Sequence, residues 1–404
     1  MKAFKRSLLA LTITCAFAAG AAHAQISDNV VKIGVLSDMS GLYSDLAGPG
    51  SVVAAKMAVE DSGIEKRGYK VEIVSADHQN KPDVGSAIAR QWYDSDGVDA
   101  IFDVPTSSVA LAVNQVTRDK GKAFIVSGAA SSDLTGKACS PNTVHWTYDT
   151  WMLANGTGGA IVKTGGDSWY FITADYAFGH ALERDTMEVV KKNGGKVLGA
   201  VRAPLNTQDF SSFLLQAQGS KAKIIGLANA GGDTINSIKQ AAEFGIVKGG
   251  QNLAGLLVFI SDIHGLGLNT AQGLIFTETF YWDLNDQTRA FAKRLAAANN
   301  GKYPTMVQAG VYAGVLHYLK AVEALKSDDG TKVVAQMKKT PTDDPLFGKG
   351  RIREDGRKLH PAYLVEVKKP SESKGPYDYY KVRSTIPAEQ AFRPEKDGGC
   401  SLVK

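Results

Sequence analysis

Hydroxyl-bearing and small residues follow three apolar segments in the first third of the sequence. The first of these loops comes after residues 30–36 and contains Ser40, Tyr43 and three glycines. The other two loops, residues 105–108 and 127–132, consist of small and hydroxyl-bearing residues. Hydroxyl groups and the backbone amides at helix starts are suited to bind a carboxylate. Each loop taken alone is better explained as helix N-capping, for which Ser and Thr are favoured, but three together suggest the rim of a cleft.

The sequence lacks the common catalytic and nucleotide-binding motifs. No G-x-G-x-x-G follows the first apolar segment, residues 128–137 lack P-loop spacing, and neither G-x-S-x-G nor H-E-x-x-H occurs. The six histidines after residue 24 form no closely spaced pair, so we expect no metal and no cofactor. Asp175 and Asp262 leave the carboxylate pair of an exported glycosidase as an alternative, but we expect a protein that is not an enzyme.

Residues 1–24 have the pattern of a secretory signal peptide. Three basic residues precede an apolar run, residues 8–19, which is too short to span a bilayer. We expect cleavage after Ala24 and a mature protein in the periplasm. Cys15 leaves a lipoprotein signal as an alternative, although Thr12-Ile13-Thr14 fits such a signal poorly.

Charge and cysteine content narrow the possible partners and the compartment. The formal net charge of +5 falls to +2 when the three basic residues of the signal peptide are removed. Both signs of charge are scattered, so the sequence indicates neither a nucleic-acid partner nor an anionic membrane surface. About 380 residues exceed what one hydrophobic core usually supports, so we expect two domains. The mature chain keeps Cys139 and Cys400, for which one disulfide is expected; two separate buried thiols are the alternative.

Short apolar segments and helix-like segments alternate through the first 147 residues. Strands are predicted at 30–36, 70–76, 98–104 and 123–127, and helices at 51–62, from Pro82 onward and at 108–120. This alternation predicts a doubly wound parallel sheet. The carboxyl ends of parallel strands share one edge of such a sheet, and ligands of open α/β sheets bind there. The three hydroxyl-rich loops should therefore surround one cleft.

A second series of the same kind follows residues 141–149. Its helices are predicted at 151–163, 179–192, 210–218 and 234–244, and its strands at 168–173, 196–202, 222–229 and 253–260. The predicted fold class is therefore α/β, with two doubly wound parallel-sheet lobes. The remaining chain should complete each lobe with late segments. These are a strand at 273–280, helices at 287–298, 307–325 and 331–339, and extended pieces at 351–354, 361–368 and 377–383.

Five segments, in order, carry a resemblance to a known family. They are VVKIGVLSDMSGLYSDLAGPG, DVPTSSVALAV, IVSGAASSDLT, FITADYAFGHAL and GRIREDGRK. Across essentially the whole mature chain, this set resembles the periplasmic solute-binding proteins of branched-chain amino acid and amide ABC importers, which have the type I periplasmic-binding-protein fold. The segments HWTYDTW, ADHQNKPDV and LANAGGDT look closest to the subgroup that binds lignin-derived aromatic acids.

The resemblance implies two lobes joined by three crossovers, with the ligand in the cleft and a closure that exposes a surface read by the permease. The crossovers are expected near Thr147, Phe280 and Arg351. The implied partners are the membrane subunits of an ABC permease, and the protein is expected to be a monomer. The expected lobes are 26–147 with 281–350 for lobe 1, and 148–280 with 351–404 for lobe 2.

The resemblance also implies a set of ligand contacts. The family holds a ligand carboxylate on a hydroxyl and backbone amides of the loops after the third and fourth strands. The matching positions in this sequence are Thr106, Ser107, Ala129 and Ala130, with Ser40 and Tyr43 of the first loop as further candidates.

The second lobe of the family offers an aromatic residue and an acidic partner for a ligand ammonium. These positions match Tyr176 or Phe178, and Asp262. Asn229 ends a strand and is a further candidate, but the aromatic that commonly follows it is replaced by Ala230-Gly231-Gly232. This departure favours an aromatic ligand, whose candidate walls are Tyr43, Trp146, Tyr148 and Phe178.

The expected function is therefore the capture of a small carboxylate, with an aromatic acid favoured, and its delivery to an ABC permease. Binding of a branched-chain amino acid or amide by the same fold is one alternative. Free ligand sensing without transport is the other, and ordinary core packing remains the alternative role for each aromatic ring.

Overall fold

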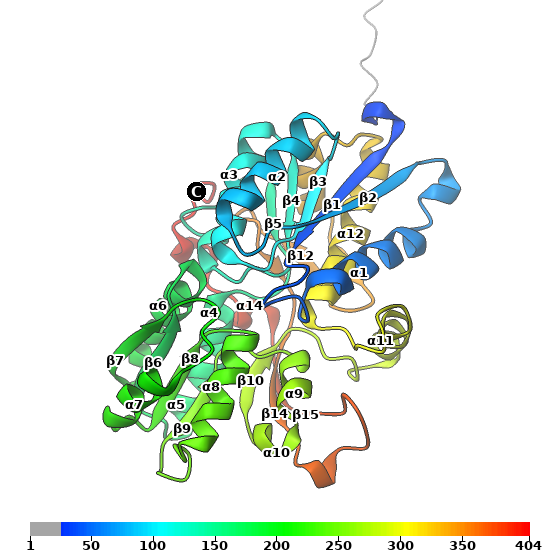
Figure 1. Cartoon of the computed structure of the whole chain (residues 1–404). Coiled ribbons are helices and arrows are strands. Elements are labelled where there is room, and N and C mark those ends of the chain that lie inside the picture. The colour runs from blue at the N-terminus through cyan, green and yellow to red at the C-terminus, as the bar shows by residue number, and fades with distance from the viewer. Residues whose placement is uncertain (1–25) are drawn as a thin grey trace, which may run out of the picture.

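The computed structural model describes residues 26–404 as two α/β lobes, each built on its own parallel sheet (Figure 1). The predicted signal peptide and its cleavage after Ala24 lie outside these residues. Within this range no helix combines the length and the apolar character needed to cross a membrane. The predicted fold class, α/β with two doubly wound parallel sheets, is confirmed.

The sheet of the first lobe has five parallel strands in the order β2-β1-β3-β4-β5. Ile33 of β1 pairs with Ile73 on one side and with Ala100 on the other, so β1 lies inside the sheet. Strands β1, β3 and β4 are almost entirely buried, as expected when helices cover both faces. The elements are β1 (Val31–Ser37), α1 (Gly48–Ser62), β2 (Val71–Asp77), α2 (Pro82–Asp94), β3 (Ala100–Asp103), α3 (Ser107–Lys120), β4 (Ala123–Val126) and β5 (Thr143–His145).

The sheet of the second lobe has four parallel strands in the order β7-β6-β8-β9. The chain enters this lobe through a helical segment that is interrupted by a π-helical turn at Ala154–Gly158. The elements are α4 (Thr150–Leu153), α5 (Gly159–Lys163), β6 (Ser168–Ala174), α6 (Ala177–Lys192), β7 (Lys196–Ala203), α7 (Ser211–Gly219), β8 (Ile224–Ala228), α8 (Gly232–Glu243), β9 (Asn252–Gly255), α9 (Ile260–Leu266) and α10 (Leu268–Ala271).

Segments late in the chain adjoin both lobes. A three-stranded antiparallel sheet, β10-β14-β15, adjoins the second lobe, and three late helices and the antiparallel sheet β11-β12-β13 follow between β10 and β14. The elements are β10 (Ile275–Glu278), α11 (Asp286–Ala298), α12 (Met306–Leu325), α13 (Gly330–Lys339), β11 (Thr342–Asp344), β12 (Gly348–Ile352), β13 (Lys358–Leu359), β14 (Ala362–Val367), β15 (Tyr380–Ile386) and α14 (Ala388–Ala391).

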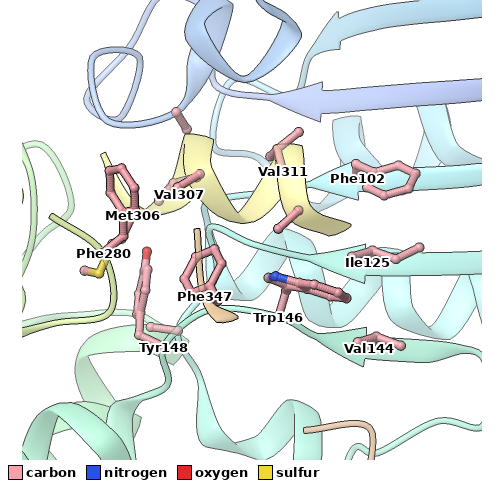
Figure 2. Close-up of a cluster of buried hydrophobic side chains, with 14 of the residues drawn as sticks. Phe102, Ile125, Val144, Trp146, Tyr148, Phe280, Met306, Val307, Val311 and Phe347 are labelled. Carbon is pink, nitrogen blue, oxygen red and sulfur yellow. The ribbon is translucent and has the colours of Figure 1, made fainter. Parts of the chain in front are cut away.

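Helix α12 forms much of the core of the first lobe. Figure 2 shows its Val307 and Val311 beside the side chains that β3, β4 and β5 project, and these residues belong to one buried apolar cluster. A Cβ on Gly310 would lie 2.2 Å from Cγ2 of Thr147, so only glycine allows α12 this close to the chain that leaves β5. The packing of α12 therefore also fixes the start of the first crossover.

The predicted lobe boundaries differ from the observed strand pairing at the end of the chain. Arg357 pairs with His145 at the edge of the first sheet, whereas β14 pairs with β10 of the second lobe. We therefore propose a third crossover at His360–Pro361, later than the expected Arg351. The chain after β15 also returns to the first lobe, where Cys400 is bonded to Cys139.

Two local predictions differ from the structure. β5 was not predicted, because three residues within the polar stretch 141–149 carry too short an apolar pattern. The predicted strand 253–260 is wrong in its second half: β9 ends at Gly255, and residues 256–259 form a buried loop before α9. Its apolar composition is typical of a buried strand, and periodicity alone does not separate the two.

Asp262 stabilises the start of α9 at the end of this loop. Its Oδ2 accepts a hydrogen bond from the backbone amide of Phe259 at 2.9 Å, which satisfies one of the unpaired donors of a helix N-terminus. Asp262 is 3% exposed, and burial raises the pKa of its carboxyl group to about 7.

The Asp262→Asn substitution should remove a pH dependence of stability. The pKa is about 7 in the folded protein and about 4 in the unfolded chain, so the folded state binds the proton more tightly. This contribution is complete below about pH 4 and is lost as the pH rises through about 7. Asparagine keeps an acceptor for the Phe259 amide without titrating. Between pH 5 and pH 8, urea unfolding should show a larger loss of stability in the wild type, by about 2 kcal/mol; equal changes would contradict the assignment.

Breaking the Cys139–Cys400 bond should lower stability. The two residues are 261 positions apart, and closing so long a loop stabilises the folded state by about 5 kcal/mol in the chain-entropy model, before any strain. Scanning calorimetry should give a lower midpoint for a Cys139→Ser, Cys400→Ser double variant. Reductant should bring the wild type to the same midpoint and leave the double variant unchanged. A wild type that melts like the double variant without reductant would show that no bond forms.

Candidate ligand-binding site

A cavity lies between the two lobes, at the carboxyl ends of their parallel strands. The space in it that the centre of a water-sized sphere can occupy is about 10 Å³, which is room for about one water molecule in this arrangement of the lobes. Loops after β1, β3 and β4 form one wall, and loops after β6, β8 and β9 form the other. This is where open α/β sheets bind their ligands. The lining residues are Tyr43, Leu46, Pro105, Gly128, Ala130, Tyr148, Tyr176, Phe178, Ala230, Leu257 and Phe259.

Tyr43 is placed in the cavity by a loop that folds around the buried carboxylate of Asp38. Oδ1 of Asp38 accepts a hydrogen bond from the amide of Gly41 at 2.7 Å. Its Oδ2 accepts from the amide of Tyr43 at 2.8 Å and from Nδ2 of Asn80 at 2.7 Å. A Cβ on Gly41 would lie 2.8 Å from Oδ1, so the loop requires glycine there. These donors, with the amide of Ser40 at 3.4 Å as a fourth, compensate for the burial of the carboxylate and hold the loop in one conformation.

Thr106 precedes α3 but does not cap it. Its hydroxyl donates to Oδ1 of Asn80, and no side chain caps this helix start. The Asn80 amide cannot be turned over, because its Nδ2 donates to the carboxylate of Asp38. The proton of Thr106 is therefore committed within the first lobe, and the N-capping explanation fails at this loop.

Ser107 links the two hydroxyl-rich loops that follow β3 and β4. Its Oγ accepts hydrogen bonds from the amides of Ala130 at 3.3 Å and Ser131 at 3.1 Å. The predicted amide of Ala130 is thus already donated within the protein, and the carbonyl of Ala129 lies 2.7 Å from Nε2 of His145. Within residues 26–404 the Ser107 hydroxyl only accepts hydrogen bonds, so its proton is available for a further partner.

Tyr148 lines the cavity from the first crossover. Its hydroxyl donates to the carbonyl of Gly128 at 2.5 Å, and its ring packs edge-on against Phe259 with centroids 5.8 Å apart. Arg357, which is fully buried, donates to the carbonyls of Thr147 at 2.7 Å and Tyr148 at 3.4 Å. Burial lowers the pKa of Arg357 to about 10, so the guanidinium stays charged at neutral pH.

The start of α6 brings two aromatic residues to the cavity from the second lobe. A Cβ on Gly179 would lie 2.0 Å from the carbonyl oxygen of Ala174, so only glycine lets the first turn of α6 approach the end of β6. Tyr176 and Phe178 flank this turn, with ring centroids 5.8 Å apart. The Tyr176 hydroxyl lies 2.6 Å from that of Tyr43, which joins the two lobes directly.

The small residues after β8 make room for the first lobe. A Cβ on Gly231 would lie 2.9 Å from the carbonyl oxygen of Leu42 and 3.0 Å from the ring of Tyr43. The space left by the missing aromatic after Asn229 is therefore occupied, in part, by the Tyr43 loop. Tyr43 is one of the rings predicted to wall the ligand site.

Tyr43, Ala130, Tyr148 and Phe178 line the cavity, and Thr106, Ser107 and Ala129 lie in its loops. The other predicted contacts do not line it. Ser40 is exposed and its hydroxyl donates to Asp77 at 2.9 Å. The amide of Asn229 is bonded to Thr234 and Ser237, and Asp262 caps α9. Trp146 is fully buried in the core beside α12 (Figure 2), which is the packing role left open for it.

Several lining residues were not predicted. Leu257 and Phe259 lie in the loop that was taken as a strand end, and Leu46, Pro105 and Gly128 are apolar or small residues of loops that were otherwise identified. The first-lobe loops were identified as part of the site from their Ser and Thr residues. The apolar lining residues could not be identified in this way, because their side chains have no hydrogen-bonding groups.

The cavity lining contains no charged side chain. Asp103, Asp233 and Glu278 are buried acids outside the lining. Burial raises the pKa of Asp103 and of Asp233 to about 7, and that of Glu278 well above its ordinary value. Within residues 26–404, no group of three or more His, Cys, Asp or Glu side chains is arranged to hold a metal ion. The site is therefore suited to binding through hydrogen bonds and ring contacts.

The family described as periplasmic binding protein matches residues 30–375 of the chain. Among curated relatives, the Leu/Ile/Val-binding protein homolog 6 of Brucella melitensis is 27% identical over 375 residues. That alignment covers 89% of this chain and 93% of that protein.

Solved structures of the same kind are similar over nearly the whole chain. A periplasmic binding protein from Burkholderia mallei is 54% identical, with a TM-score of 0.91, covering 93% of this chain and 100% of that one. A branched chain amino acid ABC transporter periplasmic ligand-binding protein from Burkholderia xenovorans LB400 is 42% identical, with a TM-score of 0.82 and the same coverage. A solute-binding protein of an ABC transporter from R. palustris, in complex with 4-hydroxybenzoate, is 24% identical, with a TM-score of 0.80, and covers 89% of this chain and 97% of that one. This last likeness shows the fold alone.

The family match spans most of the chain, and the fold and the interlobe cavity agree with it. The family is one of solute-binding proteins and not an enzyme class, and it indicates a periplasmic location. The chain belongs to the periplasmic binding protein family, with the type I fold that its sequence predicted.

Proposed function

We propose that this protein captures a small carboxylate, with an aromatic acid favoured, as the substrate-binding component of an ABC importer. The cavity between the lobes is the binding site, and the bound ligand is delivered to the membrane permease. A ligand that contacts both walls stabilises the closed arrangement of the lobes. The size of this effect is set by how much more tightly the ligand binds the closed than the open arrangement.

The composition of the cavity lining is the observation that carries this proposal. Five of the eleven lining residues are aromatic and none is charged. Rings on several sides favour an aromatic ligand, since edge-on and offset ring pairs add about 0.5 to 1.5 kcal/mol each beyond buried area. The ammonium of an amino acid would lose its hydration here without an acidic side chain in the lining to replace it.

The first-lobe wall offers the place for the carboxylate. The start of α3 has no side-chain cap, and the free hydroxyl proton of Ser107 lies at this helix start beside Ala130 of the lining. Uncapped amides at a helix start favour an anion, and hydrogen bonds to a charged acceptor are worth about 1.5 to 3 kcal/mol. Thr106 is the poorer donor of the two, because its proton is given to Asn80.

Binding of a branched-chain amino acid or amide is the second candidate. The names of the relatives from Brucella melitensis and Burkholderia xenovorans favour it. Asp262 would then have to leave the Phe259 amide and reach an ammonium group in the cavity. A sensor of the same ligand that acts without a permease is the remaining alternative.

A thermal-shift screen of the mature protein tests the ligand class. The panel contains benzoate, hydroxybenzoates and hydroxycinnamates on one side, and leucine, valine and their amides on the other. A ligand at a hundred times its dissociation constant adds about 2.7 kcal/mol to the stability of the folded state. We expect shifts with the aromatic acids. Shifts with leucine or valine and none with the aromatic acids would replace this proposal by the amino-acid alternative.

The Ser107→Ala substitution should weaken binding of an aromatic carboxylate by about tenfold or more, because a hydrogen bond to the charged group is lost. Ser131→Ala is the matched control, since the Ser131 hydroxyl accepts from the amide of Asp133 at a separate helical turn and does not lie at the start of α3. Isothermal titration calorimetry should show near wild-type affinity for this control. Unchanged affinity in the Ser107 variant would mean that the carboxylate binds elsewhere.

A further inference from the structure

Hydrogen-bonding capacity in the cavity is concentrated in three side chains. The lining residues with polar side-chain atoms are all tyrosines, Tyr43, Tyr148 and Tyr176. Tyr148 has no proton to offer, because it donates to the carbonyl of Gly128 at 2.5 Å. Tyr43 and Tyr176 are therefore the side chains of this lining that can donate to a polar group on the ligand other than its carboxylate.

Tyr43 and Tyr176 together have more hydrogen-bonding capacity than they use. Their oxygens are 2.6 Å apart, and either one can be the donor. Two hydroxyls carry two protons, and their mutual bond uses one. The other proton enters no hydrogen bond within residues 26–404, and lone pairs remain on both oxygens. The pair thus presents a donor and an acceptor side by side.

The environment keeps this pair neutral. Burial raises the pKa of Tyr43 and of Tyr176 above the ordinary value, and Asp233 raises both further when its carboxyl group is ionised. Asp233 is itself buried, and its Oδ1 has no hydrogen-bond partner within the described chain. Both hydroxyls therefore keep their protons at neutral pH.

A phenolic hydroxyl matches this pair better than other substituents do. It accepts from the free proton and donates to a free lone pair, so both capacities are used. An unsubstituted ring leaves the buried donor without a partner, so the cost of removing that donor from water is not compensated. We propose that the ligand is a ring-hydroxylated aromatic acid, and that Tyr43 and Tyr176 determine this specificity by binding the ring hydroxyl. This inference rests on the proposed function, because it specifies the class of aromatic acid.

The test compares hydroxylated and plain benzoates on the mature protein. Titration calorimetry measures the dissociation constants of benzoate, 3-hydroxybenzoate and 4-hydroxybenzoate with the wild type, Tyr43→Phe, Tyr176→Phe and Tyr148→Phe. The readout is the ratio of the affinity for the better hydroxybenzoate to that for benzoate. Loss of the bond between the lobes affects all three ligands alike, so the ratio isolates recognition of the hydroxyl.

We expect the wild type to prefer one hydroxybenzoate by about tenfold. The Tyr43 and Tyr176 variants should bring the ratio close to one, whereas the Tyr148 variant should keep it, because its hydroxyl is committed to Gly128. A wild-type ratio near one, or an unchanged ratio in both pair variants, would overturn the inference while benzoate binding still upholds the proposed function. If leucine binds and none of the benzoates does, the proposed function and this inference both fail.

Discussion

The buried guanidinium of Arg357 connects two segments of the chain beside the ligand cavity, its own segment and residues 147–149. Arg357, at the edge of the first sheet, donates to the carbonyls of Thr147 and Tyr148 and lies 3.3 Å from Oδ2 of Asp149. Asp149 in turn caps α4, where the second lobe begins, by accepting from the amide of Met152 at 2.8 Å. Removing one partner of a buried ion pair typically costs about 3 to 5 kcal/mol, so the crossover has little freedom next to this residue.

The path of the chain between β5 and α4 determines where Tyr148 lies in the cavity, because Tyr148 belongs to this connecting segment and lines the cavity. On either side of it, the carboxyl ends of two parallel sheets bring loops together. The first lobe supplies Tyr43 and the loops that carry Ser107 and Ala130, and the second supplies Tyr176, Phe178 and Phe259. No cation neutralises the ligand within this lining. Binding energy in the proposed complex must therefore come from neutral donors and from the burial of a ring, at roughly 25 cal/mol per Å² of apolar surface.

Much of the fold could be predicted, because each element carries its own periodicity and end signals. The strand 30–36 and the loop after it were recognised from an apolar run that stops at small residues, and β1 occupies that run. β5 has three residues, and the loop at Leu257 and Phe259 is as apolar as a strand, so neither could be assigned from pattern alone. Their conformations depend on neighbours that are distant in sequence.

The candidate site was predictable in its loops but not in its hydrogen bonds. Thr106 and Ser107 are adjacent and chemically alike. The hydroxyl of Thr106 donates its proton to Asn80, whereas the hydroxyl of Ser107 only accepts hydrogen bonds within residues 26–404. The difference is set by Asn80, whose orientation is fixed by Asp38, 42 positions earlier in the sequence. Asp262 illustrates the same limit, since its position agreed with an ammonium partner while its carboxylate is held by a helix start.

A crystal structure of the mature protein with a bound aromatic acid tests the account most directly. We expect the carboxylate within hydrogen-bond distance of Ser107 Oγ, and the ring between Tyr148 and Phe178. An aromatic acid bound with its carboxylate away from the start of α3 would contradict the account, as would an amino acid in the cavity whose ammonium group is paired with Asp262.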